Sequence, residues 1–113
     1  MLIEKKEIKE VEGMSYIEAV FDSTNILKTT YFPQEERLYI SFGRGQTYSY
    51  GRINEEVYER FEKAGSQGKF FVDEIKNNTE KHPFRKEFSL YPREIEEIRK
   101  IIIENKKKEG NCE

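Results

Sequence analysis

The sequence predicts an α+β domain, in which a small antiparallel β-sheet, a meander, is followed by two short helices and a longer C-terminal helix. Three observations support this fold class. The first half of the chain is rich in β-branched and aromatic residues, which favour strands. Turn residues separate the candidate strands, and apolar residues in the second half recur at helical spacing. At 113 residues, the chain 1–113 is expected to form one domain.

The first 53 residues divide into candidate strands. The segment LIEKKEIKEV alternates weakly and fits an edge strand, whereas MSYIEAVFDS fits a strand or a helix. The strand pattern is clearer in ILKTTYF and LYISF, which flank the turn PQEER. The segment GRGQ then predicts a hairpin connection, and TYSYGRI is the returning strand.

This hairpin carries two tyrosines, Tyr48 and Tyr50, one residue apart. If GRGQ is a connection of even length, Tyr48 lies opposite Ser41, and Tyr50 lies opposite Tyr39. The hairpin then has an aliphatic face and a tyrosine face that ends in Arg52. A single bulge would reverse this assignment, because a shift of one residue turns every side chain to the other face. We expect at least one of the two tyrosines to be buried with its hydroxyl hydrogen-bonded.

The next part of the chain is predicted to be helical. Asn54 fits the N-cap of a helix that Gly65 ends, and Ser66 fits the N-cap of a second helix. A polar linker, NNTEKHPF, begins at residue 77, and residues 79–113 hold most of it and the C-terminal helix, SLYPREIEEIRKIIIENKKK. The isoleucine stripe of that helix is wider than one contact needs, which predicts a homo-oligomer formed through it. The stripe consists of Ile95, Ile98, Ile101, Ile102 and Ile103.

Spaced markers in residues 15–78 resemble the KTSC domain family. They are Tyr48, Tyr50, Ile53, Tyr58, Ala64, Ser66, Gly68, Phe71 and Ile75. Domains of this family occur at the C-terminus of some lysyl-tRNA synthetases and as stand-alone bacterial proteins. The resemblance implies an RNA-binding role, which the association with a tRNA synthetase suggests. It implies no catalytic residues. The N-terminal charged strand and the C-terminal isoleucine helix depart from the family pattern.

The chemical inventory does not favour an enzyme. The chain has one histidine, His82, which lies in the polar linker and is expected on the surface, and one cysteine, Cys112. It therefore lacks the four ligands of a common zinc site, and it carries no nucleotide-cofactor motif, so no metal and no cofactor are expected. A lone cysteine forms no internal disulfide, which favours a reducing, cytoplasmic location. No segment is apolar enough to span a membrane, and the charged N-terminus does not fit a signal peptide.

Two groups of residues are candidates for binding. The tyrosine face with Arg44 and Arg52 could hold a ligand or could be a second packing face. The start of the second helix, with Ser66 and Lys69, could hold a phosphate or could be an ordinary capped turn.

The charge balance bears on the class of ligand. The net charge is −2, and no segment is strongly basic, so a small anionic nucleotide is favoured over a long polyanion. Rings would stack on its base, and cations would hold its phosphate. In a dimer, Arg93 and Arg99 of the C-terminal helix would add basic pockets. The alternatives are an RNA-binding module and a protein-interaction module that uses the isoleucine helix.

Overall fold

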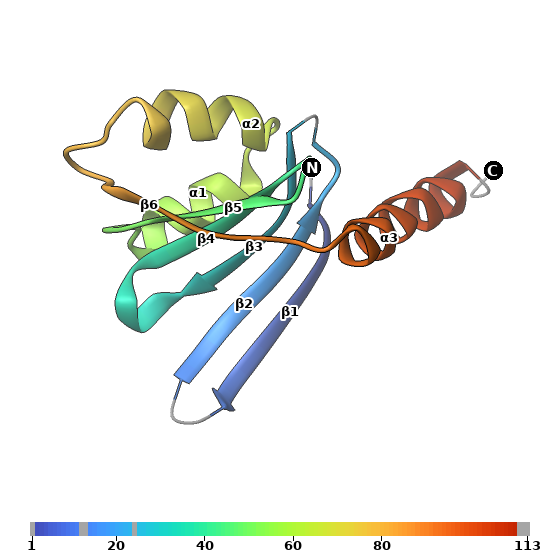
Figure 1. Ribbon diagram of the computed structural model, residues 1–113, viewed down its shortest axis with the longest axis horizontal. Helices are drawn as coiled ribbons and strands as arrows, with labels where there is room; N and C mark the ends of the chain where they lie inside the picture. The colour runs from blue at the N-terminus through green and yellow to red at the C-terminus, as the bar shows by residue number, and fades with distance from the viewer. Residues whose placement is uncertain (1, 12–13, 24, 111–113) are drawn as a thin grey trace.

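The computed structural model describes residues 2–11, 14–23 and 25–110; Cys112 lies outside them. Six strands form one antiparallel sheet in the order β1-β2-β3-β4-β5-β6 (Figure 1). The fold class predicted from the sequence is therefore confirmed. The strands are β1 (Leu2–Val11), β2 (Met14–Phe21), β3 (Ile26–Phe32), β4 (Arg37–Phe42), β5 (Gln46–Tyr50) and β6 (Phe84–Ser89). A short 3-10 helix, η1 (Pro33–Glu35), joins β3 to β4.

The helices begin at the predicted caps. Asn54 accepts a hydrogen bond from the Val57 amide and caps α1 (Glu55–Lys63). Ser66 accepts one from the Lys69 amide and caps α2 (Gln67–Phe70). The helix α2 runs directly into a π-helix, η2 (Phe71–Lys76), and the C-terminal helix is α3 (Pro92–Gly110).

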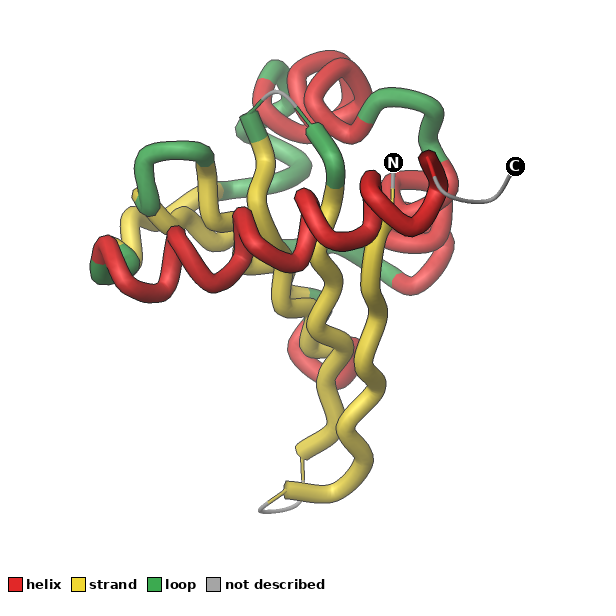
Figure 2. Tube along the Cα trace, turned by 90° about the vertical axis from the view of Figure 1, so that its right-hand side faces the viewer, coloured by secondary structure: helices red, strands yellow, loops and turns green. Residues whose placement is uncertain are grey.

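The two faces of the sheet are covered by different helices. The helices α1, α2 and η2 cover one face, and α3 crosses the other (Figures 1 and 2). Neighbouring strand residues therefore belong to different clusters: Ala19 lies in the main core, whereas Val20 packs against Leu27 and Ile98 under α3. This alternation is the period of two expected of a strand that is buried on both sides. We call the face under α1 and α2 the main face.

The predicted hairpin register is wrong by one residue. Tyr48 lies opposite Ile40, and Tyr50 lies opposite Leu38, so both tyrosines share the main face with the aliphatic residues. The turn between β4 and β5 has an odd number of residues, 43–45. Gly45 adopts a φ of 91° and donates its amide to the Phe42 carbonyl, which is the geometry of a three-residue hairpin turn. The bulge that reverses the faces is therefore present.

Two further expectations about the C-terminal third need correction. Residues 84–89, predicted to join the end of the linker to the start of the C-terminal helix, form the sixth strand and pair with β5. Their pattern FRKEFS carries three charges and no β-branched residue, so local preference gave no strand signal. His82, expected on the surface, is 2% exposed. The isoleucine stripe is largely used within the chain, because Ile95, Ile98 and Ile102 of α3 pack in one cluster with residues that include Leu27 and Leu90, but Ile103 is 53% exposed.

Candidate ligand-binding site

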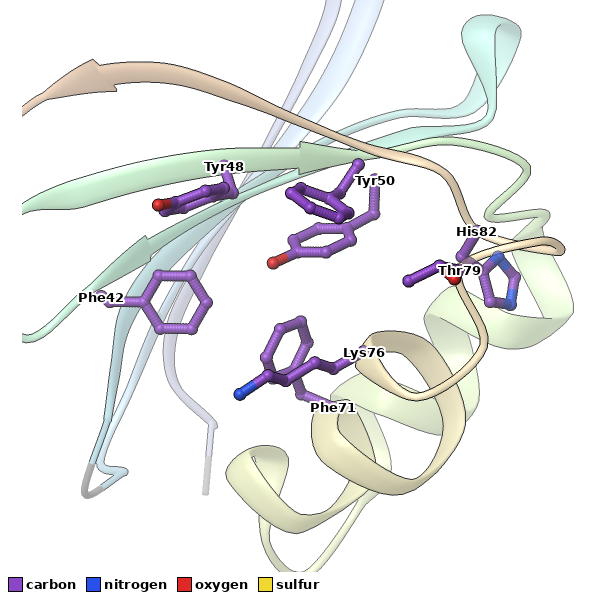
Figure 3. A pocket seen from close by; sticks show the side chains of 8 residues that line it. Phe42, Tyr48, Tyr50, Phe71, Lys76, Thr79 and His82 are labelled. Carbon is purple, nitrogen blue, oxygen red and sulfur yellow. The ribbon is translucent and has the colours of Figure 1, made fainter.

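An aromatic cavity opens between the edge of the main face and η2 (Figure 3). Its volume is about 440 Å³. Strand residues contribute one wall, η2 contributes the facing wall, and the segment before β6 closes one end. We call this cavity the aromatic pocket. Its lining residues are Phe42, Tyr48, Tyr50, Phe71, Lys76, Thr79, His82 and Phe84.

The rings of the aromatic pocket pack edge to face or tilted. The Tyr50 and Phe71 centroids lie 5.1 Å apart in a T-shaped pair, and those of Phe42 and Tyr48 lie 6.1 Å apart. Phe84 tilts against both tyrosines. Tyr50 and Phe71 are each only 6% exposed, so the ring surface open to a ligand lies mainly on Phe84, which is 57% exposed, and on the half-buried Phe42 and Tyr48.

Tyr50 lies at the centre of this arrangement. Its side chain is 6% exposed, which confirms that one tyrosine of the pair is buried. Burial, with a smaller effect of the Tyr48 hydroxyl, raises the pKa of Tyr50 to about 12. The Tyr50 hydroxyl points into the pocket (Figure 3), and within the described part of the chain it makes no hydrogen bond. No described protein group satisfies this hydroxyl, so its expected hydrogen bond would come from a ligand or water in the pocket.

The π-helix brings Phe71 and Lys76 to the same wall. These residues are five apart, and in an α-helix, at 100° per residue, they would point about 140° away from each other. A π-helix bonds residue i to residue i+5, as the Asn77 amide does with the Val72 carbonyl at 3.2 Å. Residues five apart therefore lie closer to the same side of the helix than they would in an α-helix. The irregular helix thus places an ammonium group beside the rings (Figure 3), and π-helical turns often occur at functional sites.

The end of the pocket is held by a link between β5 and β6. His82 Nδ1 lies 3.1 Å from the Gly51 carbonyl oxygen, and the Gly51 amide donates to the Pro83 carbonyl at 2.8 Å. Because a carbonyl oxygen only accepts, Nδ1 carries the proton in this arrangement. His82 is therefore a buried link that positions Thr79 and Phe84 at the pocket, which explains why it is not a surface residue.

A basic cleft lies next to the aromatic pocket. The two share Phe42, Phe71 and Lys76 as lining residues. The cleft has a volume of about 560 Å³ and gains two further cations, Arg44 and Arg99. Arg99 comes from α3 and donates Nη2 to the Gly43 carbonyl at 2.9 Å, so the last helix is tied to the β4–β5 turn. The described residues that line the pocket and the cleft include no carboxylate.

The start of α2 lines a different cleft. Ser66 and Lys69 lie there with two acidic residues, Asp22 and Asp73. The Ser66 hydroxyl accepts the Lys69 amide. The neighbouring Gln67 is fully buried and donates Nε2 to three carbonyls at the end of α1. These polar groups thus form a capped turn that joins two helices, and they are not gathered with the tyrosines.

The remaining predicted residues lie outside the pocket and the cleft. Arg52 is exposed, has a φ of 56°, and donates to the Glu80 carbonyl at 3.5 Å. Arg93 is exposed near the start of α3. The structure therefore brings Tyr48 and Tyr50 together with Arg44 and Arg99, but it does not bring in the other four predicted residues. Those four are Arg52, Ser66, Lys69 and Arg93.

Sequence reasoning missed most of the pocket wall. Phe71 was named as a marker of the family resemblance, but its place at a cavity was not predicted. The missed residues are Phe42, Phe71, Lys76, Thr79, His82 and Phe84. Among the described residues, no cluster of three or more potential ligands is arranged to hold a metal ion. No helix in the described ranges combines the length and apolar character needed to span a bilayer.

Comparison with known proteins places this architecture. No curated protein sequence matches the chain. The fold is similar to the crystal structure of a KTSC domain protein from Yersinia pestis, with a TM-score of 0.56 and 27% sequence identity. That alignment covers 75% of this chain and 100% of the other. The sequence profile of the KTSC domain matches residues 22–78, half of the chain. This protein belongs to the KTSC domain family.

Proposed function

We propose that this domain is a non-enzymatic binding module that sequesters or senses a small anionic nucleotide. One observation carries the proposal: an aromatic pocket and a basic cleft lie side by side and share three lining residues, and the described residues that line them include no carboxylate. The chain as a whole has 22 acidic and 20 basic residues. A carboxylate-free surface in so acidic a chain favours an anionic ligand.

The aromatic pocket suits a base. Its volume of about 440 Å³ falls in the usual range for small-molecule sites, roughly 300–1,000 Å³. Stacking of a base on an aromatic side chain contributes about 1–3 kcal/mol and tolerates any base. The hydroxyls of Tyr50 and Thr79 supply polar groups that orient the ligand (Figure 3).

The basic cleft suits the phosphate end of the same ligand. Lys76 lines both spaces, so it lies where the sugar would meet the phosphate. Arg99 uses one donor for Gly43, and a guanidinium has five donors in a fixed fork. A charge-assisted hydrogen bond contributes about 1.5–3 kcal/mol, so loss of one cation should weaken binding by about 10- to 100-fold.

An RNA strand is the alternative ligand. It would place its phosphates over a longer surface, and its affinity would then fall steeply with salt. The acidic balance of the chain and the size of the pocket favour one nucleotide over a strand.

Calorimetric titration with nucleosides and 5′-nucleotides tests the proposal. We expect the nucleotide to bind and the matching nucleoside to bind more weakly. Lys76→Ala and Arg99→Ala should weaken nucleotide binding by about 10- to 100-fold. Arg93→Ala is the matched control, because Arg93 is an exposed arginine on the same helix outside the cleft. Absence of binding to any nucleotide, or an equal loss in the Arg93 variant, would overturn the proposal.

Self-association through α3 is a separate part of the proposed behaviour. It rests on Ile103, which is 53% exposed although the neighbouring Ile102 is packed. Light scattering after size exclusion should give twice the chain mass of 13.5 kDa, and Ile103→Glu should return the mass to that of a monomer. A wild-type monomer at tens of micromolar would contradict this expectation.

A further inference from the structure

Three cations converge on the basic cleft from three separate segments. Lys76 comes from η2, Arg44 from the β4–β5 turn and Arg99 from α3. Each side chain is exposed, so its charged group is accessible to a ligand. The backbone holds the segments together, since the Leu90 amide also donates to the Gly45 carbonyl at 2.7 Å. The cleft therefore lies where three segments of the chain meet, and its cations do not come from a single helix.

The positive charges of this cleft are not neutralised by the protein. Among the described residues, ion pairs within 4.0 Å involve Lys5, Arg60 and Arg85 as the cations. Lys76, Arg44 and Arg99 take part in none of them. The charge of the cleft is thus about three positive units, with no acidic residue in its lining. Like charges brought together without a counter-ion repel one another, and a bound anion removes that repulsion.

One phosphate does not match this charge. A phosphate monoester carries about −1.5 to −2 at pH 7, so it would leave one cation of the three without a partner. Each added phosphate brings further negative charge and further acceptor oxygens. The volume of the cleft also has room for more than one phosphate. The cleft measures about 560 Å³, and the pocket proposed for the base measures about 440 Å³.

The cleft also differs from sites that take a metal-bound polyphosphate. Protein sites for magnesium nucleotides use one or two carboxylates together with the phosphates to hold the ion. The described lining offers lysine, arginine and amide groups instead. Here the protein's own cations would perform the charge neutralisation that Mg²⁺ performs elsewhere.

We propose that the ligand is a nucleoside di- or triphosphate, bound free of metal, with its phosphate chain extended across Lys76, Arg44 and Arg99. This inference rests on the proposed nucleotide-binding function and specifies it. The base lies among the rings of the aromatic pocket. The phosphate chain leaves the pocket past Lys76 and ends between the β4–β5 turn and α3.

Calorimetric titration with the mono-, di- and triphosphate of one nucleoside tests the inference. The affinity should rise by about tenfold with each added phosphate. In the Arg44→Ala and Arg99→Ala variants this increase should shrink, while the affinity for the monophosphate changes less. The Arg93→Ala variant should keep the full increase. Adding Mg²⁺ in excess should weaken binding of the triphosphate, because the ion competes with the cleft for the same oxygens.

The outcomes separate this inference from the broader function. Equal affinity for the three nucleotides, or stronger binding with Mg²⁺, would overturn the polyphosphate inference and leave nucleotide binding intact. Absence of binding to all three would overturn both. Thermal melting of each variant without ligand checks that it is folded, which we expect because the substituted arginines are exposed.

Discussion

Two groups of aromatic side chains lie on the main face of the sheet, and they differ in whether they border a cavity. In the closed group, Tyr31 stacks on Tyr58 with centroids 4.3 Å apart and donates its hydroxyl to the Ile53 carbonyl at 2.8 Å. In the open group, Tyr48 and Tyr50 border a cavity. The same residue type is therefore core material at one end of a face and pocket lining at the other. Both groups contain tyrosines, so residue type alone does not separate the two roles. The groups differ in the helix that packs on them, which is α1 for the closed group and η2 for the open group.

The closed group should give the largest effect on stability. Tyr31 is 1% exposed, and Tyr31→Ala removes a stacked ring and a buried hydrogen bond. We expect a loss of about 5 kcal/mol, the upper end for aromatic-to-alanine changes in a core. Urea unfolding followed by circular dichroism measures it. A loss below about 2 kcal/mol would mean that the two groups do not differ as described.

Tyr50 should give a smaller loss than Tyr31. Replacing a buried tyrosine of this hairpin by alanine is expected to cost about 3–5 kcal/mol. Because Tyr50 already borders a cavity, we expect Tyr50→Ala to fall near about 3 kcal/mol. Tyr50→Phe should change stability little, since the hydroxyl has no partner among the described residues. If Tyr50→Ala melts like the wild type but loses the ligand, the ring belongs to the site and not to the core.

Alkaline pH should weaken both groups together. Burial raises the pKa of Tyr31 and of Tyr50 from 10.0 to about 12. Below pH 10 both the folded and the unfolded states keep the protons, and the stability is at its full value. Between pH 10 and pH 12 the unfolded state loses protons first, so the stability falls as the pH rises. Urea unfolding over this range should show a shallower fall for Tyr50→Phe; an unchanged slope would place Tyr50 in contact with solvent.

Replacing Tyr48 should weaken nucleotide binding while changing the stability of the fold only slightly. It is only half-buried at the margin of the core, so Tyr48→Ala should cost about 1 kcal/mol or less, well below the change at Tyr50. Loss of a stacking ring should weaken nucleotide binding by about 1–3 kcal/mol. The comparison fails if Tyr48→Ala destabilises the protein as much as Tyr50→Ala and leaves calorimetric binding unchanged.

The sequence predicted local features of this fold better than its pairings. The Asn54 and Ser66 caps could be predicted because a cap depends on three or four adjacent residues. The hairpin register could not, because it depends on the φ of Gly45, and GRGQ fits turns of either parity. The strand β6 was missed because it forms only where β5 supplies its hydrogen-bonding partner.

In the candidate site, too, local residue types could be predicted, whereas the contacts between distant segments could not. Tyr48, Tyr50, Arg44 and Arg99 could be named as ring and cation candidates from residue type. Their assembly could not be foreseen, because Lys76 reaches the pocket only through the π-helical geometry of η2. His82 was misplaced since its burial depends on a carbonyl 31 residues away in the chain.

The aromatic pocket is assembled from two stretches of the chain, of which the family profile covers only one. Its floor, from Phe42 to Lys76, lies within the segment that matches the family profile, residues 22–78. Its rim, Thr79, His82 and Phe84, follows that segment. A match to the family profile therefore says nothing about the rim, because the profile ends at residue 78. A role established for one member of the family should pass to another only where the rim also agrees.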